Sequence, residues 1–355
     1  MKAFVTGGAG FIGSHLVDAL LAKDWTVTVY DNLSTGSLGF LECPLGLNGN
    51  SKDPRLEFVK GDLLDEEKLL TSLKGHEVVF HLAANADVRG GPKNTKKDFQ
   101  QNTVATHNVL EAMRVNDVRN LIFTSSAVVY GEPEVFPTPE GYRSKQTSLY
   151  GASKLAAEAL IEAYANYYDQ RVQTFRFVSL LGERYTHGVV FDFVKKLKAD
   201  PRVLEILGDG NQKKSYLYVG DAISGILTAF DHHQEHKGVH VYNLGNRRAL
   251  NVCEVASLVT SELGLPTPKY HFTGGARGWV GDSPYVHLDT SKLEGLGWRP
   301  GVSIEDGVRR TTRYLMDHPE HLKSRSLGDP VPQVFSARDG QPRETHPTSA
   351  TPRAG

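Results

Sequence analysis

The sequence predicts a doubly wound α/β fold, in which helices cover both faces of a parallel sheet and a smaller C-terminal lobe follows. Two observations carry this prediction. Short β-rich apolar runs alternate with helical stretches through the first half of the chain, as in a parallel sheet. The apolar run at 3–5 leads directly into Gly7-x-x-Gly10-x-x-Gly13, after which the pattern turns helical. This order of strand, glycine turn and helix opens many doubly wound folds.

The remaining elements follow in order. We expect further strands at 26–30, 56–60, 77–84, 121–125 and 172–176, and helices at 66–73, 96–115 and 150–168. The alternation loosens after residue 178, with helices expected at 191–199, 221–230, 251–263 and 303–317 and strands at 214–219 and 239–244. Asn251 and Ser303 are the expected N-caps of the last two helices. We therefore divide the chain into a sheet domain (1–178, with a return near 214–246), a lobe (179–322) and a disordered tail (323–355).

Composition excludes several classes of protein. The 355 residues carry a net charge of −1, which favours neither nucleic acid nor an anionic membrane as a partner. No apolar stretch approaches the ~20 residues that span a bilayer. Cys43 and Cys253 lie far apart and indicate neither a disulfide framework nor a metal site. Because the first strand begins at residue 2, we expect no secretory signal and a soluble, cytoplasmic protein without a metal.

The glycine turn predicts a dinucleotide site. Glycines let the backbone approach a pyrophosphate, and the helix that follows aims free N–H groups at it. Asp31 ends the next strand, where a carboxylate meets the ribose hydroxyls and repels a 2′-phosphate, so NAD is expected rather than NADP. The alternative is a glycine-rich turn with a capping Asp.

A second pair of residues points to redox chemistry. Tyr150 and Lys154 lie four apart on an expected helix and so share a face. A nearby ammonium, together with an oxidised nicotinamide, favours the phenolate and should pull the tyrosine pKa down from about 10. Ser126 ends the preceding strand, where its hydroxyl can bond a carbinol or carbonyl oxygen. The alternative is a serine-rich strand end that satisfies backbone groups.

Six stretches together resemble the extended short-chain dehydrogenase/reductases, which have a Rossmann domain. They are Thr6-Gly-Gly-Ala-Gly-Phe-Ile-Gly-Ser-His15, Asp31-Asn32, Gly61-Asp62, His81-Leu-Ala-Ala84, Ser125-Ser-Ala-Val-Val-Tyr-Gly131 and Ser148-x-Tyr150-Gly-x-Ser-Lys154. Within that family the chain is similar to the nucleotide-sugar epimerases, most of all the UDP-glucose 4-epimerase branch, from residue 1 to about 322.

The resemblance implies bound NAD and a catalytic set of Ser126, Tyr150 and Lys154. The cofactor contacts that it implies, besides Tyr150 and Lys154, are Gly7, Gly10, Phe11, Ile12, Gly13, Asp31, Asn32, Asp62, Leu63, Leu82, Ala83, Ala84 and Asn102. It also implies a homodimer formed through the helices near 98–115 and 150–168.

The residues after Ser126 help to choose the reaction. Related dehydratases place an Asp-Glu pair there, decarboxylating relatives an acid, and some multi-position epimerases a cysteine. This chain has Ala127 and Val128, neither of which moves a proton. What remains is redox chemistry at a carbinol, and together with it the resemblance implies epimerisation at C4 of a UDP-sugar through a 4-keto intermediate. The alternatives are a CDP- or GDP-sugar epimerase and a non-catalytic NAD-binding redox sensor.

The resemblance places the substrate contacts in the lobe. Ser126 and Ser179 would contact the sugar, Ser179 standing where an asparagine is usual. Lys214 replaces a usual arginine as a diphosphate contact, Arg277 is the second diphosphate contact and Asp282 the ribose-side partner. Val286 stands where a tyrosine would exclude N-acetylated sugars. A solvated surface is the alternative for these lobe residues, and a solvated turn is expected for the histidine-rich stretch 231–236.

Overall fold

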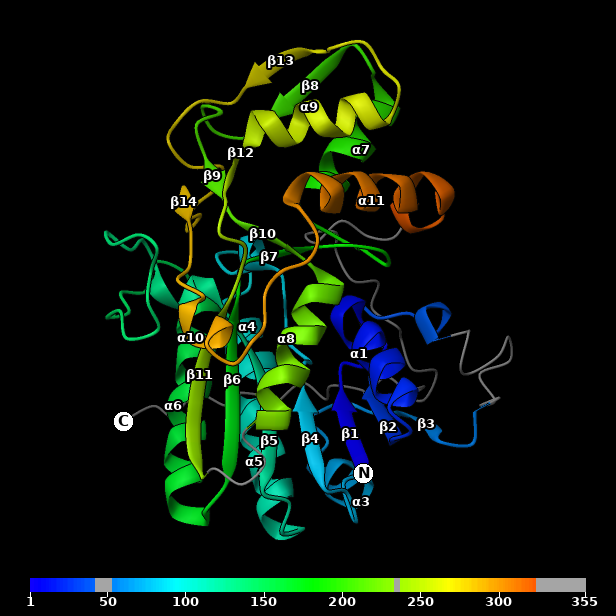
Figure 1. Ribbon diagram of the computed structural model, residues 1–355, viewed down its shortest axis with the longest axis vertical. Helices are drawn as coiled ribbons and strands as arrows, with labels where there is room; N and C mark the ends of the chain where they lie inside the picture. The colour runs from blue at the N-terminus through cyan, green and yellow to red at the C-terminus, as the bar shows by residue number, and fades with distance from the viewer. Residues whose placement is uncertain (42–52, 233–236, 324–355) are drawn as a thin grey trace, which may run out of the picture.

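A seven-stranded parallel sheet forms the centre of the molecule within the residues that the computed structural model describes, which are 1–41, 53–232 and 237–323 (Figure 1). The strand order is β11-β6-β5-β4-β1-β2-β3. The strands are β1 (Lys2–Thr6), β2 (Thr26–Asp31), β3 (Leu56–Lys60), β4 (Val78–His81), β5 (Asn120–Ser126), β6 (Arg171–Phe177) and β11 (Gly238–Leu244). The order reverses between β1 and β4, where such sheets bind ligands at the carboxyl ends of their strands. The predicted doubly wound fold is confirmed.

Helices cover both faces of the sheet, because its strands are apolar on both sides. One face packs on α1 (Phe11–Ala22) and α8 (Val219–His232), through buried residues that include Leu16, Leu20 and Ile226. The other face packs on α3 (Glu66–Ser72), α5 (Ala105–Val115) and α6 (Leu149–Tyr168). Helix α8 and strand β11, although they come late in the chain, belong to this domain.

The lobe lies beyond the carboxyl ends of the strands (Figure 1). It contains α7 (Val189–Ala199), α9 (Val252–Glu262), α11 (Ile304–Asp317), β7 (Ser179–Leu181), β8 (Val203–Ile206), β9 (Lys213–Lys214), β10 (Tyr216–Tyr218), β12 (Leu250–Asn251), β13 (Lys269–Phe272) and β14 (Tyr285–Val286). Helix α10 (Ser291–Glu294) lies beside β11, where Lys292 donates to the Val241 carbonyl (Figure 1). Short helical turns are η1 (Leu38–Leu41), η2 (Val88–Gly90), η4 (Ala127–Tyr130) and η5 (His321–Lys323). Both expected N-caps are confirmed: Asn251 forms a capping box with Glu254, and Ser303 accepts the Asp306 N–H.

Two expected elements are divided. The helix expected at 96–115 is three segments, α4 (Thr95–Asp98), the π-helical η3 (Phe99–Val104) and α5. The strand expected at 214–219 is divided at Ser215, whose hydroxyl donates to the Asn246 carbonyl oxygen. Before the break, β9 pairs with β12 and β14; after it, β10 pairs with β7. Both sequence patterns continue through the break, so periodicity alone could not locate it. None of the described helices is long and apolar enough to cross a bilayer. The predictions for Cys43, residues 233–236 and residues 324–355 lie outside the described residues.

Candidate active site

The glycine turn between β1 and α1 has no room for side chains. Gly7 has φ +70°, and a Cβ there would lie 2.7 Å from the backbone nitrogen of Ala83. A Cβ on Gly13 would lie 2.1 Å from the Gly7 carbonyl oxygen, so that α1 packs against the turn. Helix α1 begins after Gly10 with no side-chain cap. The first-turn N–H groups of α1 are thus available to an anion.

Acidic and amide side chains collect where β2 and β3 end. Asp31 is 8% exposed, and its carboxylate accepts the N–H groups of Ala9 (3.0 Å) and Leu33 (2.8 Å). Burial raises the pKa of Asp31, and these two hydrogen bonds oppose the shift. Asn32 donates to the Asp62 carboxylate at 3.0 Å. Leu63, the next residue, is buried. The carboxylate of Asp31 therefore lies beside the glycine turn.

The segment after β4 is held in place by a series of hydrogen bonds through His81. The Ala83 N–H donates to Thr6 Oγ1, which lies 2.7 Å from His81 Nδ1. His81 Nε2 lies 3.0 Å from Thr106 Oγ1, and Thr106 in turn donates to the Asn102 carbonyl. Because the Thr106 hydroxyl donates to the Asn102 carbonyl, the hydrogen bond between His81 and Thr106 requires a proton on His81 Nε2. Burial lowers the pKa of His81 to about 3, which keeps the ring neutral. Leu82, Ala83 and Ala84 thus leave the sheet beside Gly7 in a fixed geometry.

Asn102, on the π-helical segment, holds two parts of the site together. It is 1% exposed; its amide oxygen accepts the Asn85 N–H and its nitrogen donates to Ser153 Oγ, one residue before Lys154. The side chain joins the loop after β4 to helix α6. Phe11 and Ile12 pack into the protein, Phe11 edge-on to Tyr185 of the lobe at 5.4 Å between ring centroids.

Ser126, Tyr150 and Lys154 lie together at the carboxyl end of β5. Ser148 caps α6 by accepting the Gly151 N–H at 3.0 Å, which starts the helix just before Tyr150. Ser126 lies close enough to the Tyr150 phenol to lower the pKa of the phenol. Lys154 is 2% exposed, donates to the Thr124 carbonyl at 2.9 Å and lies over the Phe123 ring at 4.7 Å. The structure brings the three predicted catalytic side chains to one place.

In the protein chain without NAD, the pKa of Tyr150 is raised. Burial raises it to about 12, and Ser126 lowers it by less; the depressed value expected from the sequence also requires the charge of an oxidised nicotinamide and stays a prediction. Burial also lowers the pKa of Lys154 to about 8. Loss of solvation disfavours both charged forms, and the Lys154 ammonium is bonded to a backbone carbonyl rather than to the phenol.

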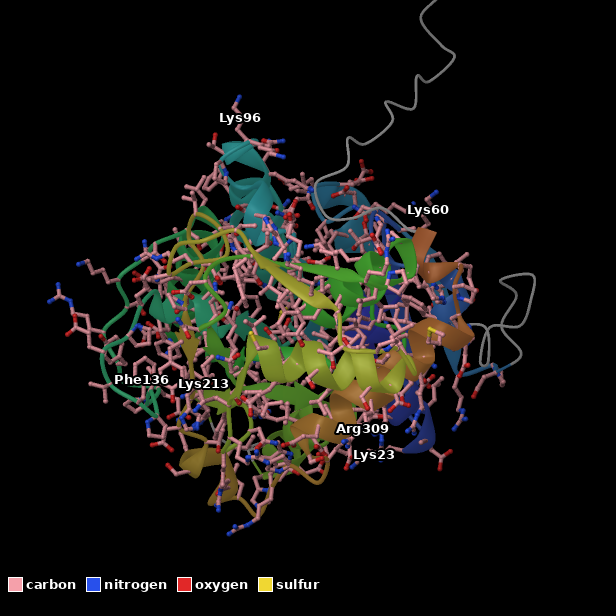
Figure 2. All side chains as sticks on the ribbon, turned by 90° about the horizontal axis from the view of Figure 1, so that it is seen from above. Lys23, Lys60, Lys96, Phe136, Lys213 and Arg309 are labelled. Carbon is pink, nitrogen blue, oxygen red and sulfur yellow. The ribbon has the colours of Figure 1, made fainter. Side chains whose placement is uncertain are left out.

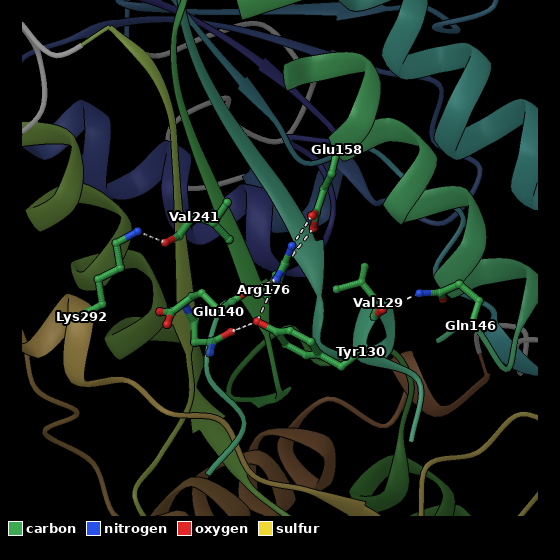
Figure 3. Close-up of polar contacts among 9 residues, drawn as sticks. Val129, Tyr130, Glu140, Gln146, Glu158, Arg176, Val241 and Lys292 are labelled. Atoms are coloured by element: carbon green, nitrogen blue, oxygen red, sulfur yellow. Dashed lines mark hydrogen bonds and ion pairs between the residues drawn. The ribbon is translucent and has the colours of Figure 1, made fainter. Parts of the chain in front are cut away.

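Helix α6 is anchored to the sheet by a buried ion pair (Figure 3). Glu158, one turn after Lys154, pairs with Arg176 of β6 at 2.6 Å, and both side chains are under 10% exposed. Arg176 also donates to the Tyr130 hydroxyl and to the Glu140 carbonyl, each at 2.9 Å. Tyr130 donates to Asn243 of β11 at 2.7 Å. The helix that carries Tyr150 and Lys154 is therefore held in register with β6.

The predicted lobe residues are only partly brought together. Lys214 pairs with the 3%-exposed Asp282 at 2.5 Å, and β14 aligns Val286 beside Lys214. Arg277 instead pairs with Glu132 at 2.7 Å and is half exposed. Ser179 is exposed at the start of β7.

Tyr285 does not share the face of Val286, because neighbouring residues of a strand point to opposite faces. Its ring packs on Phe136 at 4.3 Å between centroids. Figure 2 shows Phe136 on the loop at one side of the molecule, with Lys213 on the same side.

Sequence reasoning missed Arg89 and Trp279. Arg89 of η2 lies over the Trp279 ring at 4.6 Å, and Lys214 lies over the same ring at 4.8 Å. Arg89 could have been predicted as a site residue because it follows β4 at the ligand edge of the sheet. For Trp279 the signal was the unusual Arg277-Gly-Trp-Val-Gly-Asp282 stretch itself.

These features fit NAD. The glycine turn is a cradle that any Cβ would fill, α1 offers N–H groups for a pyrophosphate, and the Asp31 carboxylate matches ribose hydroxyls while opposing a 2′-phosphate. Such a fold and site define a short-chain dehydrogenase/reductase that binds NAD.

Comparison with known proteins places the chain within that class. Residues 3–245 match the NAD dependent epimerase/dehydratase family, and the chain belongs to this family. A putative UDP-glucose 4-epimerase of Methanocaldococcus jannaschii is 34% identical over 88% of this chain and 98% of its own. A crystal structure of a UDP-galactose 4-epimerase has a TM-score of 0.79 and 39% identity, covering 90% and 99% of the two chains. The UDP-glucose 4-epimerase of Thermus thermophilus, solved with NAD, has a TM-score of 0.77 and 31% identity, covering 89% and 99%.

Proposed function

We propose that this protein uses NAD to epimerise a UDP-sugar at C4. One observation carries the proposal: Ser126, Tyr150 and Lys154 lie together at the carboxyl end of β5, while the neighbouring Ala127 and Val128 carry no proton-transfer group. The family includes dehydratases, whose chemistry needs a further acid and base. The similarity to UDP-glucose and UDP-galactose 4-epimerases supports the uridine nucleotide and the C4 position.

Three side chains, Tyr150, Ser126 and Lys154, have separate roles in the proposed reaction. The glycine turn and Asp31 would hold NAD, which would supply a hydride acceptor and donor for C4 of the sugar. Tyr150 removes the proton of the 4-hydroxyl and gives it back, and Ser126 holds the same oxygen by a hydrogen bond. Because burial raises the pKa of Tyr150 to about 12, the phenol needs positive charge nearby to release its proton. Lys154, buried one turn along the helix, supplies part of that charge.

Replacing the phenol tests this assignment. Tyr150→Phe should retain bound NAD and the fold but lose at least ~10²–10⁴-fold in kcat, the usual contribution of a positioned acid–base group. Conversion of UDP-glucose to UDP-galactose, followed by chromatography of the products, is the measurement. Tyr168→Phe, on the exposed end of the same helix, is the matched control.

Two outcomes would refute the proposal. Near-normal turnover by Tyr150→Phe would remove the tyrosine from the mechanism. Stoichiometric NADH accumulating in solution would make the protein a dehydrogenase, because an epimerase returns each hydride. A panel that includes CDP- and GDP-sugars separates the uridine nucleotide from its alternatives.

We also propose that the site accepts N-acetylated sugars. The family resemblance implies that Val286 stands where a tyrosine would exclude N-acetylated sugars, and the Tyr285 ring packs against Phe136. Valine is smaller than tyrosine by a whole ring, which leaves room for an acetamido group at C2.

The homodimer implied by the family likeness is a further proposal. Phe99, Val115, Tyr167 and Tyr168 are exposed apolar residues on or next to α5 and α6, the helices expected to form the interface. Exposed apolar residues gathered on two neighbouring helices favour contact with a partner. Light scattering of the purified chain, which should give twice the monomer mass, is the check.

A further inference from the structure

The stretch from Arg277 to Asp282 folds against the start of the catalytic helix. The Asp282 carboxylate accepts the Gly278 N–H at 3.1 Å, and the Asp282 N–H donates to the Trp279 carbonyl at 3.0 Å, which closes the loop on itself. Gly281 has φ +87°, and a Cβ there would lie 3.2 Å from both Ser148 Cβ and the Thr147 carbonyl oxygen. Ser148 is the N-cap of α6, so this loop of the lobe touches the helix two residues before Tyr150.

Trp279 joins the two parts of the molecule across the site. The guanidinium of Arg89, from the sheet domain, lies 4.6 Å from the centre of the indole ring, and the ammonium of Lys214, from the lobe, lies 4.8 Å from it. Arg89 is also paired with Asp192 of α7 at 2.9 Å. Both cations are thus held in place by carboxylates as well as by the ring.

The indole N–H of Trp279 is buried and has no hydrogen-bond partner among the described residues. A buried tryptophan N–H usually finds a partner, since leaving it unpaired costs free energy. Trp298 illustrates the usual case, because its N–H bonds the Asp221 carbonyl and Ser224 Oγ, each at 3.0 Å. A free donor beside two cations is suited to an anionic oxygen.

We propose that Trp279 is a substrate-binding residue whose Nε1–H donates to a diphosphate oxygen of the nucleotide sugar, with Arg89 and Lys214 neutralising the charge. The inference rests on the proposed function, because that function supplies the diphosphate. It adds two contacts to those expected from the sequence. One is a hydrogen-bond donor, Trp279, from the 277–282 stretch of the lobe, and the other is a cation, Arg89, from the sheet domain. Binding of the diphosphate thereby links the lobe to the sheet domain above Tyr150.

Intrinsic fluorescence of the full-length, NAD-loaded protein reports on this residue directly. Of the three tryptophans, Trp25 and Trp298 are 8% and 3% exposed, whereas Trp279 is half-buried beside the proposed ligand. Titration with UDP should change the emission of the wild-type protein, and Trp279→Phe should abolish that change. Trp25→Phe, a core substitution at the amino end of β2, should leave both the UDP response and the epimerase activity intact.

Calorimetric titration with UDP then measures how much the hydrogen bond from Trp279 contributes to the affinity. Trp279→Phe keeps an aromatic ring but lacks the N–H, so the Kd for UDP should rise roughly ten- to hundredfold, as expected for a lost bond to a charged group. Trp279→His, which restores a ring N–H, should recover part of the affinity. In turnover, KM for the UDP-sugar should rise by a larger factor than kcat falls. Circular dichroism and NAD content show whether each variant is folded.

Two results would overturn the inference. If Trp279→Phe binds UDP as tightly as the wild type, the indole N–H does not meet the diphosphate. If the variant loses affinity for UDP-sugars but not for UDP, the N–H meets the sugar instead. Failure of the proposed function is distinguishable: UDP would still perturb Trp279, while no nucleotide sugar would be epimerised.

Discussion

At the scale of single residues, burial decides which groups are charged in this site. Tyr150 and Lys154 are both shifted toward their neutral forms because each lies in the protein interior. The same effect acts on His81, whose pKa falls to about 3 through burial and the nearby Lys154 charge. Neutral His81 accepts a hydrogen bond from the Thr6 hydroxyl and donates one to Thr106, so the series of hydrogen bonds that holds Ala83 depends on an uncharged ring.

His81 should make the protein sensitive to acid. Its folded pKa lies below the unfolded value near 6.5, so below pH 6.5 the unfolded chain binds the extra proton and stability is lost as pH falls toward 3. The free energy of unfolding should drop by up to about 1.4 kcal/mol per pH unit in this window. Urea unfolding at several pH values measures the slope. His81→Leu should be less stable at neutral pH but have a flatter slope, and an unchanged slope would contradict the assignment; exposed His271→Asn is the control.

At the scale of elements, helix α6 both presents polar side chains to the ligand edge and buries a charged side chain against the sheet. Its first two turns present Tyr150 and Lys154 to the ligand edge, and its third buries Glu158 against β6. A buried carboxylate is tolerated there because Arg176 pairs with it and the remaining donors of the guanidinium reach Tyr130 and the Glu140 carbonyl. The network in Figure 3 thereby fixes the position of helix α6 relative to the sheet.

Breaking the buried pair should be costly, whereas replacing both partners should not. Arg176→Met leaves Glu158 charged and unpaired, which should destabilise the protein by about 3–5 kcal/mol. The double variant Arg176→Met with Glu158→Leu should recover at least half of that loss. Chemical unfolding of the three proteins measures both effects. Equal stability of the single variant and the wild type would mean that the pair does not anchor α6.

At the scale of the whole molecule, the lobe completes the site from positions far along the chain. Asp282 and Val286 follow Lys214 by about seventy residues, yet they meet it through one ion pair and one strand pairing. Contacts such as Arg89 with Asp192 and Phe11 with Tyr185 hold the lobe above the glycine turn. We therefore propose that the choice of sugar depends on how the lobe packs on the sheet domain.

Val286→Tyr tests that dependence. The added ring should fill the space proposed for an acetamido group and cut kcat/KM for UDP-N-acetylglucosamine about tenfold or more, with a smaller effect on UDP-glucose. Val286→Thr, of similar size, is the matched control. Parallel assays with both sugars give the ratio. A wild-type protein that ignores the N-acetylated sugar, or a variant that loses both activities equally, would show that Val286 does not select the sugar.

Much of the site could be predicted because it depends on local patterns. A strand, Gly7-x-x-Gly10-x-x-Gly13 and a helix form the cradle by themselves, and Asp31 follows at the end of the next strand. Ser126, Tyr150 and Lys154 are set by the end of one strand and the start of one helix. The order of these elements predicts a parallel sheet, whose carboxyl ends must share an edge.

Only the tertiary structure decided the environment of these groups. The sequence places Lys154 one turn from Tyr150, but it does not show that the ammonium bonds the Thr124 carbonyl or that burial raises the pKa of the phenol to about 12. Nor does it bring Arg89 and Lys214 to Trp279, because they lie on three segments joined only by packing. Backbone geometry follows from neighbours in the chain, whereas desolvation and charge depend on residues that are distant in sequence.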